Sequence, residues 1–204
     1  MIQTEIQNLK NLESFMGQPF SFFVGEISDE HFEKICRKNS NLRIEQTAEG
    51  ELIIMPPTLP DTGWRNSDLN TDVNLWNRTS KSGIVFDSST YFTLPNGARR
   101  SPDVTWIKRE KWEKLTNEQR KKVSRIIPDF VIELRSSSDS LKSLQDKMQE
   151  YIENGVELGW LIDPQKHKVH IYRKDGKTEI LDNPKTVSGE DVLEGFELKV
   201  SDIW

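Results

Sequence analysis

The spacing of apolar side chains changes twice between residues 128 and 164, and this stretch organises the chain. Residues 130–135 alternate between two faces with the period of two that is typical of a strand. The next apolar side chains recur at steps of three and four, as on an amphipathic helix: Leu141, Leu144, Met148, Tyr151 and Ile152. The helix is expected to end near Asn154-Gly155, before a short apolar strand at residues 160–162. Strand, helix and strand together predict a parallel crossover.

The pattern elsewhere predicts further helices and strands, each bounded by turn residues such as Gly, Pro, Asn and Asp. Two helices are expected, at residues 29–38 and at about 65–78. Strands are expected, in order, at residues 41–55 (a hairpin), 83–86, 91–94, 101–107, 169–181 (a second hairpin) and 188–198. With 204 residues, the chain is expected to form one domain, residues 1–204, whose core needs neither a metal nor a disulfide.

Two acids interrupt segments that otherwise look buried. Glu133 lies in the strand at residues 130–135, where an unpartnered carboxylate is costly. Asp103 lies thirty residues earlier, in the strand expected at residues 101–107. Two carboxylates a few ångströms apart repel unless one is protonated or a cation lies between them. Hard oxygen ligands without a cluster of histidine or cysteine favour Mg²⁺ or Mn²⁺ over Zn²⁺.

A positive side chain is also needed near two such acids, and Lys147 is the candidate. It lies fourteen residues after Glu133, on the shoulder of the apolar stripe of the expected helix, from where it could reach back over the strand. Both acids also have ordinary structural explanations. Glu133 could pair with Arg135 or Arg100, and Asp103 could cap a turn.

The composition excludes several classes of protein. A single cysteine, Cys36, rules out an intramolecular disulfide and any zinc site built from several cysteines. The longest apolar runs span only a few residues, so no membrane-spanning helix is expected. Residues 1–5 lack the basic and apolar regions of a signal peptide, and the expectation is a soluble cytoplasmic protein.

Charge is distributed unevenly along the chain, although the net charge is only −5. The segment Lys108–Arg125 holds eight Lys or Arg residues against three Glu, so the remainder is strongly acidic. One interpretation is a solvated surface segment. The other is a patch beside an acidic site that faces the phosphates of a nucleic acid, with Lys121 and Lys122 among its cations.

Other candidate residues have a structural and a functional interpretation. Asp68 and Asp72 lie four residues apart on the second expected helix, either as an exposed pair of acids or as a source of a further metal ligand. Cys36 lies on the apolar stripe of the first expected helix, which favours a packed thiol over a nucleophile. His170 alternates outward on its strand and His167 lies in the preceding turn, so both are interpreted as surface histidines.

The residues around the two acids resemble a known motif. The sequence SPD at residues 101–103, followed by PDFVIE at residues 128–133, looks like the signature of the PD-(D/E)xK nuclease superfamily. More narrowly, the chain from about Ser28 to Trp204 is similar to the Uma-type putative restriction endonuclease family. Five further segments carry that similarity: residues 47–52, 84–89, 144–148, 154–155 and 158–164.

This resemblance implies an α+β fold with an α/β-like core, namely a restriction-endonuclease-like mixed β-sheet flanked by helices. An N-terminal helix with a β-hairpin would precede the core, and a C-terminal β extension would follow it. Some members of the superfamily use an extra acid as a metal ligand. Asp68 and Asp72 on a helix are the candidates here, together with Asp87 at the end of an earlier strand.

The resemblance also implies roles for the central residues. Asp103 and Glu133 would ligate a divalent cation together with the backbone carbonyl of Leu134. The lysine that usually follows the glutamate by two residues is absent, because position 135 is arginine, which stays protonated at any working pH. Lys147 is the natural replacement, as a lysine that has migrated to the helix. Gln145, on the opposite shoulder of that helix, is a candidate for positioning ligands.

The favoured function is Mg²⁺-dependent or Mn²⁺-dependent hydrolysis of phosphodiester bonds, with DNA as the partner and an endonuclease as the class of enzyme. The alternative is a nuclease fold without activity, kept as a module that binds nucleic acid or a protein. A metal-dependent enzyme acting on a small phosphorylated substrate is a third hypothesis. Endonucleases of this size often act as homodimers, but no stretch of the sequence identifies an interface.

Overall fold

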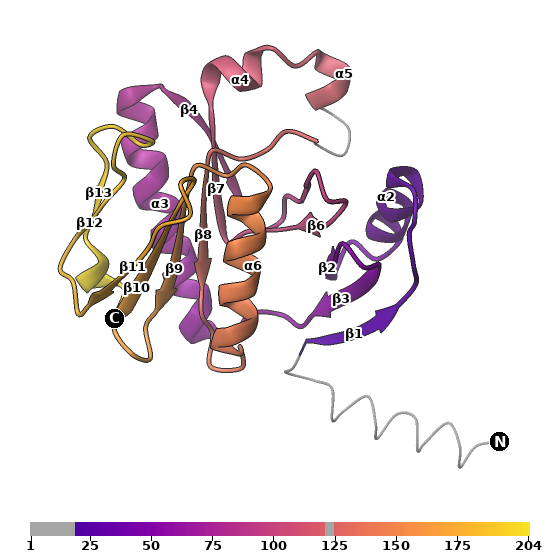
Figure 1. The fold of residues 1–204 in the computed structure, drawn as a ribbon, viewed down its shortest axis with the longest axis horizontal. Coiled ribbons are helices and arrows are strands. Elements are labelled where there is room, and N and C mark those ends of the chain that lie inside the picture. Colours follow the sequence, from indigo (N-terminus) through magenta and orange to yellow (C-terminus); the bar gives the residue numbers. More distant parts are fainter. Residues whose placement is uncertain (1–18, 121–124) are drawn as a thin grey trace.

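A six-stranded mixed β-sheet forms the centre of the protein, for which a computed structural model describes residues 19–120 and 125–204 (Figure 1). The strand order is β11-β10-β9-β8-β7-β4. β8 and β9 pair in parallel, as the crossover unit predicted, and the other neighbours are antiparallel. The strands are β4 (Gly83–Asp87), β7 (Val104–Lys108), β8 (Phe130–Leu134), β9 (Leu158–Asp163), β10 (Lys168–Arg173) and β11 (Thr178–Asp182).

One long helix covers each face of this sheet (Figure 1). α3 (Pro60–Ser80) buries Leu69 and Val73 in the cluster that contains the even-numbered residues of β8. α6 (Leu141–Glu153) buries Met148 and Tyr151 against the opposite face, in the cluster that contains Val131. Because side chains alternate along a strand, Glu133 lies on the face that α6 covers.

A second, five-stranded sheet lies on the far side of α6, with the order β1-β3-β2-β6-β5 (Figure 1). Helix α2 (Asp29–Lys38) packs Phe32 against it, and the side chain of Ser28 caps the start of this helix. The helix over 29–38 and the hairpin that follows it are thereby confirmed. The strands are β1 (Phe20–Phe23), β2 (Arg43–Gln46), β3 (Glu51–Met55), β5 (Phe92–Thr93) and β6 (Arg99–Arg100).

The remaining elements are short. Between β7 and β8 lie two short helices, α4 (Arg109–Glu113) and α5 (Asn117–Arg120). The C-terminal extension packs its apolar side chains into the cluster beneath α3, and consists of β12 (Val187–Ser188), β13 (Glu197–Leu198) and the 3₁₀-helix η1 (Val200–Asp202). No helix within residues 19–120 and 125–204 is both long and apolar enough to cross a lipid bilayer.

Two expectations from the sequence need correction. α3 begins at Pro60 rather than near Arg65, because a proline in the first turn of a helix removes an N–H that has no partner there. His170 is buried, not on the surface: β10 lies between β9 and β11, and His170 stands opposite Leu161, which α6 covers. Burial lowers the pKa of His170. His167 is exposed as expected, stacked on Trp204.

Candidate active site

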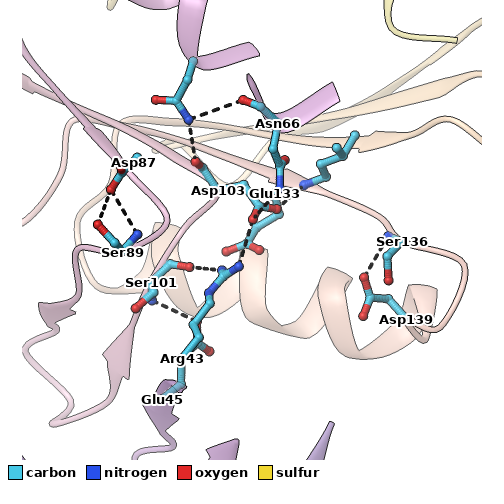
Figure 2. Close-up of polar contacts among 12 residues, drawn as sticks. Arg43, Glu45, Asn66, Asp87, Ser89, Ser101, Asp103, Glu133, Ser136 and Asp139 are labelled. Carbon is cyan, nitrogen blue, oxygen red and sulfur yellow. Dashed lines mark hydrogen bonds and ion pairs between the residues drawn. The ribbon is translucent and has the colours of Figure 1, made fainter. Parts of the chain in front are cut away.

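Asp103 is held from several directions just before β7. Its Oδ2 accepts a hydrogen bond from the backbone N–H of Leu134 at 2.9 Å, and its Oδ1 lies 3.1 Å from Nη1 of Arg43. Asn66 of α3 donates to the same Oδ1 at 3.4 Å (Figure 2). The pairing of Val104 with Ile132 places Asp103 across from the position of Glu133. These contacts fix the carboxylate of Asp103 beside the end of β8.

Glu133 is buried on β8 with only polar partners for its carboxylate. Its Oε1 accepts a hydrogen bond from the hydroxyl of Tyr151 at 2.8 Å and lies 2.9 Å from Nζ of Lys147. Burial raises the pKa of Glu133 to about 7; the negative charges of Asp103 and Glu45 add to the rise, although Lys147 and Arg43 oppose it. The carboxyl therefore gains and loses its proton near neutral pH.

Lys147 reaches this carboxylate from α6, whose N-terminus is capped by the side chain of Ser140. Its neighbours Leu144 and Met148 pack on the sheet, and its Nζ lies 2.9 Å from a carboxylate oxygen of both Glu133 and Glu45. A long methylene stem allows a lysine beside apolar neighbours to deliver its charge in this way. Burial alone would lower the pKa of Lys147. The two carboxylates outweigh burial and raise it, so the side chain stays an ammonium.

One cavity brings these side chains together. It has a volume of ≈ 120 Å³ and is lined by residues that include Arg43, Asn66, Asp103, Glu133, Leu134 and Lys147. The structure therefore brings the four site residues predicted from the sequence together around one small cavity, namely Asp103, Glu133, Leu134 and Lys147. Gln145 is not among the lining residues.

Two charged residues of β2, Arg43 and Glu45, contact the predicted site residues and were not predicted from the sequence. Glu45 accepts a hydrogen bond from the backbone N–H of Ser101 at 2.8 Å and lies 3.3 Å from Nη1 of Arg100. Burial raises its pKa, but Lys147, Arg100 and Arg43 outweigh burial and lower the pKa to about 2. A weak signal was available, because Arg43 and Glu45 share one face of a strand whose other face holds Ile44.

Asparagine, not aspartate, is the residue that α3 presents to the site. Asn66 contacts Oδ1 of Asp103, and Asn70 donates to the backbone carbonyl of Asp103 at 3.1 Å. Asp68 is exposed, and Asp72 has its pKa raised by burial and by the charges of Asp68 and Asp202. The spacing of asparagines at i and i+4 could have identified this face.

The other candidate acid and the alternative partners of Glu133 lie elsewhere. Asp87 binds the backbone and hydroxyl of Ser89 in the turn after β4 (Figure 2). Arg135 pairs with Asp163 at 2.8 Å, and Arg100 pairs with Glu45 and Glu150. Within the described parts of the chain, no group of three or more His, Cys, Asp or Glu side chains could hold a metal ion.

The described part of the basic segment lies at the opposite end of β8 from Glu133. Lys108 pairs with Glu157 at 3.1 Å, and Lys111 pairs with Asp129 at 3.2 Å. These pairs favour the interpretation of a surface segment over that of a phosphate-facing patch for Lys108 and Lys111. Lys121 and Lys122 lie outside the described residues.

Comparison with known proteins agrees with this architecture. A solved structure described as a putative nuclease belonging to DUF820, from Anabaena variabilis ATCC 29413, superposes with a TM-score of 0.72 at 22% identity. The match covers 87% of this chain and 97% of the other, and shows a common fold. No curated protein gives a significant match. The profile of the family Uma2, described as "Putative restriction endonuclease", matches residues 29–201. The chain therefore belongs to the Uma2 family.

Proposed function

We propose that this protein is an endonuclease that hydrolyses phosphodiester bonds in DNA with the help of Mg²⁺ or Mn²⁺. The observation that carries the proposal is the position of Lys147: its Nζ lies 2.9 Å from Oε1 of Glu133, at the wall of the cavity that Asp103 also lines. An acid pair with a lysine beside it matches the needs of phosphoryl-group chemistry. Membership of the Uma2 family supports the same class of reaction, and we expect the enzyme to act in the cytoplasm.

The donor set fits a hard divalent cation. Asp103 and Glu133 offer carboxylate oxygens, and Leu134, which also lines the cavity, offers its backbone carbonyl. Oxygen ligands without nitrogen or sulfur suit Mg²⁺ and Mn²⁺. When bound, such a cation polarises a scissile phosphate and lowers the pKa of an attacking water.

The chain's own residues would contribute position and charge. Lys147 stays protonated because its pKa is raised, and its positive charge would stabilise negative charge that develops on a phosphate. Tyr151 fixes the orientation of Glu133 through its hydroxyl. Arg135 is held by Asp163, so it does not compete with Lys147 for the carboxylate of Glu133.

Plasmid nicking in Mg²⁺ or Mn²⁺ tests the proposal directly. Wild-type protein should nick the plasmid, EDTA should stop it, and Glu133→Gln and Lys147→Ala should both be inactive while folded. Equal activity in all three preparations would point to a contaminant or another site, and would overturn the assignment.

The alternative function, a binding module without activity, is favoured by a specific observation. Asp103 and Glu133 are each already paired with a cationic side chain, Arg43 and Lys147. Such pairs neutralise the acids without a metal ion. A wild-type protein that binds DNA but cleaves neither DNA nor RNA at any divalent-cation concentration would establish the module.

A further inference from the structure

Glu45 is a buried carboxylate beside the candidate site to which the proposed reaction gives no role. It belongs to β2 of the second sheet, yet it lies 2.9 Å from Nζ of Lys147 on α6. The backbone N–H of Ser101 and the guanidinium of Arg100 complete its contacts. A carboxylate so deeply buried costs free energy unless it is paired, so its position needs a reason.

The ammonium of Lys147 is shared equally between two carboxylates. Its Nζ lies 2.9 Å from Oε1 of Glu45 and 2.9 Å from Oε1 of Glu133. If Glu133 were its sole partner, a divalent cation could bind Glu133 only by leaving a buried ammonium without a counter-charge. Breaking a buried ion pair in this way is strongly unfavourable. A second carboxylate removes that penalty.

We propose that Glu45 is a positioning residue that holds the Lys147 ammonium at the cavity wall, so that Glu133 can release it and bind a divalent cation. The inference rests on the proposed function, because it assumes that Glu133 is a cation ligand. Glu45 remains ionised throughout the working range, since its cationic neighbours lower its pKa to about 2 despite burial. The second sheet thereby contributes to the site through Lys147.

The chain offers a matched control for this role. Glu150, also on α6, accepts from Nε of Arg100 at 2.6 Å, as Glu45 accepts from Nη1 of the same side chain. Glu150→Gln therefore removes a carboxylate from Arg100, as Glu45→Gln does, but leaves the contacts of Lys147 intact. An effect of Glu45→Gln that Glu150→Gln does not reproduce therefore does not come through Arg100.

The first measurement detects the anchored ammonium without metal or substrate. In ¹H–¹⁵N spectra of lysine ammonium groups, Lys147 should give a slowly exchanging signal, assigned by its disappearance in Lys147→Met. Glu45→Gln should shift or broaden that signal, and Glu150→Gln should leave it in place. An unchanged Lys147 signal in Glu45→Gln would overturn the proposal.

The second measurement is the affinity for Mn²⁺, followed by electron paramagnetic resonance of the free ion. Glu45→Gln should weaken binding about tenfold or more, as loss of a residue that supports a metal ligand commonly does. Glu150→Gln should change the affinity less than twofold. In a Lys147→Met background, Glu45→Gln should have almost no further effect. The same loss in both backgrounds would show that Glu45 acts on the cation directly.

Two outcomes need separate controls: a Glu45→Gln variant that does not fold, and a wild type that binds no Mn²⁺. If Glu45→Gln does not fold, Glu45→Asp takes its place, because it keeps the charge but is one methylene shorter. It should shift the Lys147 signal and weaken Mn²⁺ binding as Glu45→Gln would, but by less. Wild-type values for Glu45→Asp in both measurements would contradict the proposal. A wild type that binds no Mn²⁺ would refute the release of Glu133 together with the proposed cation site, whereas the ammonium signal would still decide whether Glu45 anchors Lys147.

Discussion

Two aspartates follow a proline just before the central strands, and the protein uses them differently. Asp129 precedes β8; its carboxylate accepts from the backbone N–H of Lys108 at 2.8 Å and pairs with Lys111 at 3.2 Å. Asp103 precedes β7 and accepts from the backbone N–H of Leu134 at 2.9 Å. Because β7 and β8 are antiparallel, the two carboxylates lie at opposite ends of one strand pair.

Burial does not distinguish these two ends, since Asp129 is 2% exposed and Asp103 is 6% exposed. The neighbours do. The side chain of Lys111 is 36% exposed and pairs with Asp129 from the protein surface. At the other end Asp103 lines a cavity with Glu133 and Lys147, and its charge contributes to the raised pKa of Glu133. A buried acid becomes a candidate site residue where it lines a cavity together with a second acid and a lysine.

The largest expected difference between the two ends is in cleavage. Lys147→Ala should lower the nicking rate at least about a hundredfold, the reduction typical of removing one donor that stabilises transition-state charge. Lys111→Ala, which removes a lysine from the other buried acid, should leave the rate within twofold. Lys147→Arg should not restore full activity, because a guanidinium differs in geometry and cannot give up its proton. Comparable losses of nicking rate in Lys111→Ala and Lys147→Ala would show that the two ends of the strand pair do not differ in their importance for cleavage.

The two aspartates themselves should separate activity from stability. Asp103→Asn should abolish nicking and weaken Mn²⁺ binding, because the substitution removes the charge that faces the cavity. Asp129→Asn should destabilise the fold by about 1–3 kcal/mol, since it removes the buried charge that accepts from the backbone N–H of Lys108 and pairs with Lys111. Urea unfolding and nicking per folded molecule would be measured for both. Loss of activity in well-folded Asp129→Asn would show that its end of the strand pair belongs to the site.

The strand–helix–strand unit was predictable because its pattern is local. Lys147 could be placed near Glu133 from its position on the shoulder of an apolar stripe, fourteen residues along the chain. Glu45 could not be placed, because its contact with Lys147 joins residues 102 apart in sequence and depends on how the second sheet packs against α6. His170 was misplaced for a similar reason, since which face of a strand is covered depends on its neighbours in the sheet.

The raised pKa of Glu133 predicts a smaller effect, on stability against pH in the presence of EDTA. The folded protein keeps this proton up to about pH 7, whereas the unfolded chain releases it near the ordinary value of 4.5. Between these values the folded state binds more protons, so stability should fall as pH rises through this window. Glu133→Gln should flatten that part of the profile and raise the melting temperature near pH 7 by a few degrees.

Glu45 should act in the opposite direction and in another window. Its pKa is lowered to about 2, so it stabilises the fold above about pH 4.5 and loses that contribution as pH falls toward 2. Melting profiles from pH 3 to pH 8 for wild type and Glu133→Gln separate the two groups. A profile of Glu133→Gln parallel to that of wild type between pH 4.5 and pH 7 would contradict the assigned shift.

The smallest expected effect concerns the basic segment Lys108–Arg125. Lys121 and Lys122 remain predicted phosphate contacts, and removing one such lysine should reduce the slope of log affinity against log salt by about 0.9. Neutralising both should therefore weaken DNA binding at low salt and make its salt dependence less steep. Lys111→Ala is the matched control. The ammonium of Lys111 is paired with Asp129, so its removal should leave the slope unchanged. An unchanged slope in the Lys121→Ala/Lys122→Ala double variant would mean that the segment only carries solvated surface charge and does not contact phosphates.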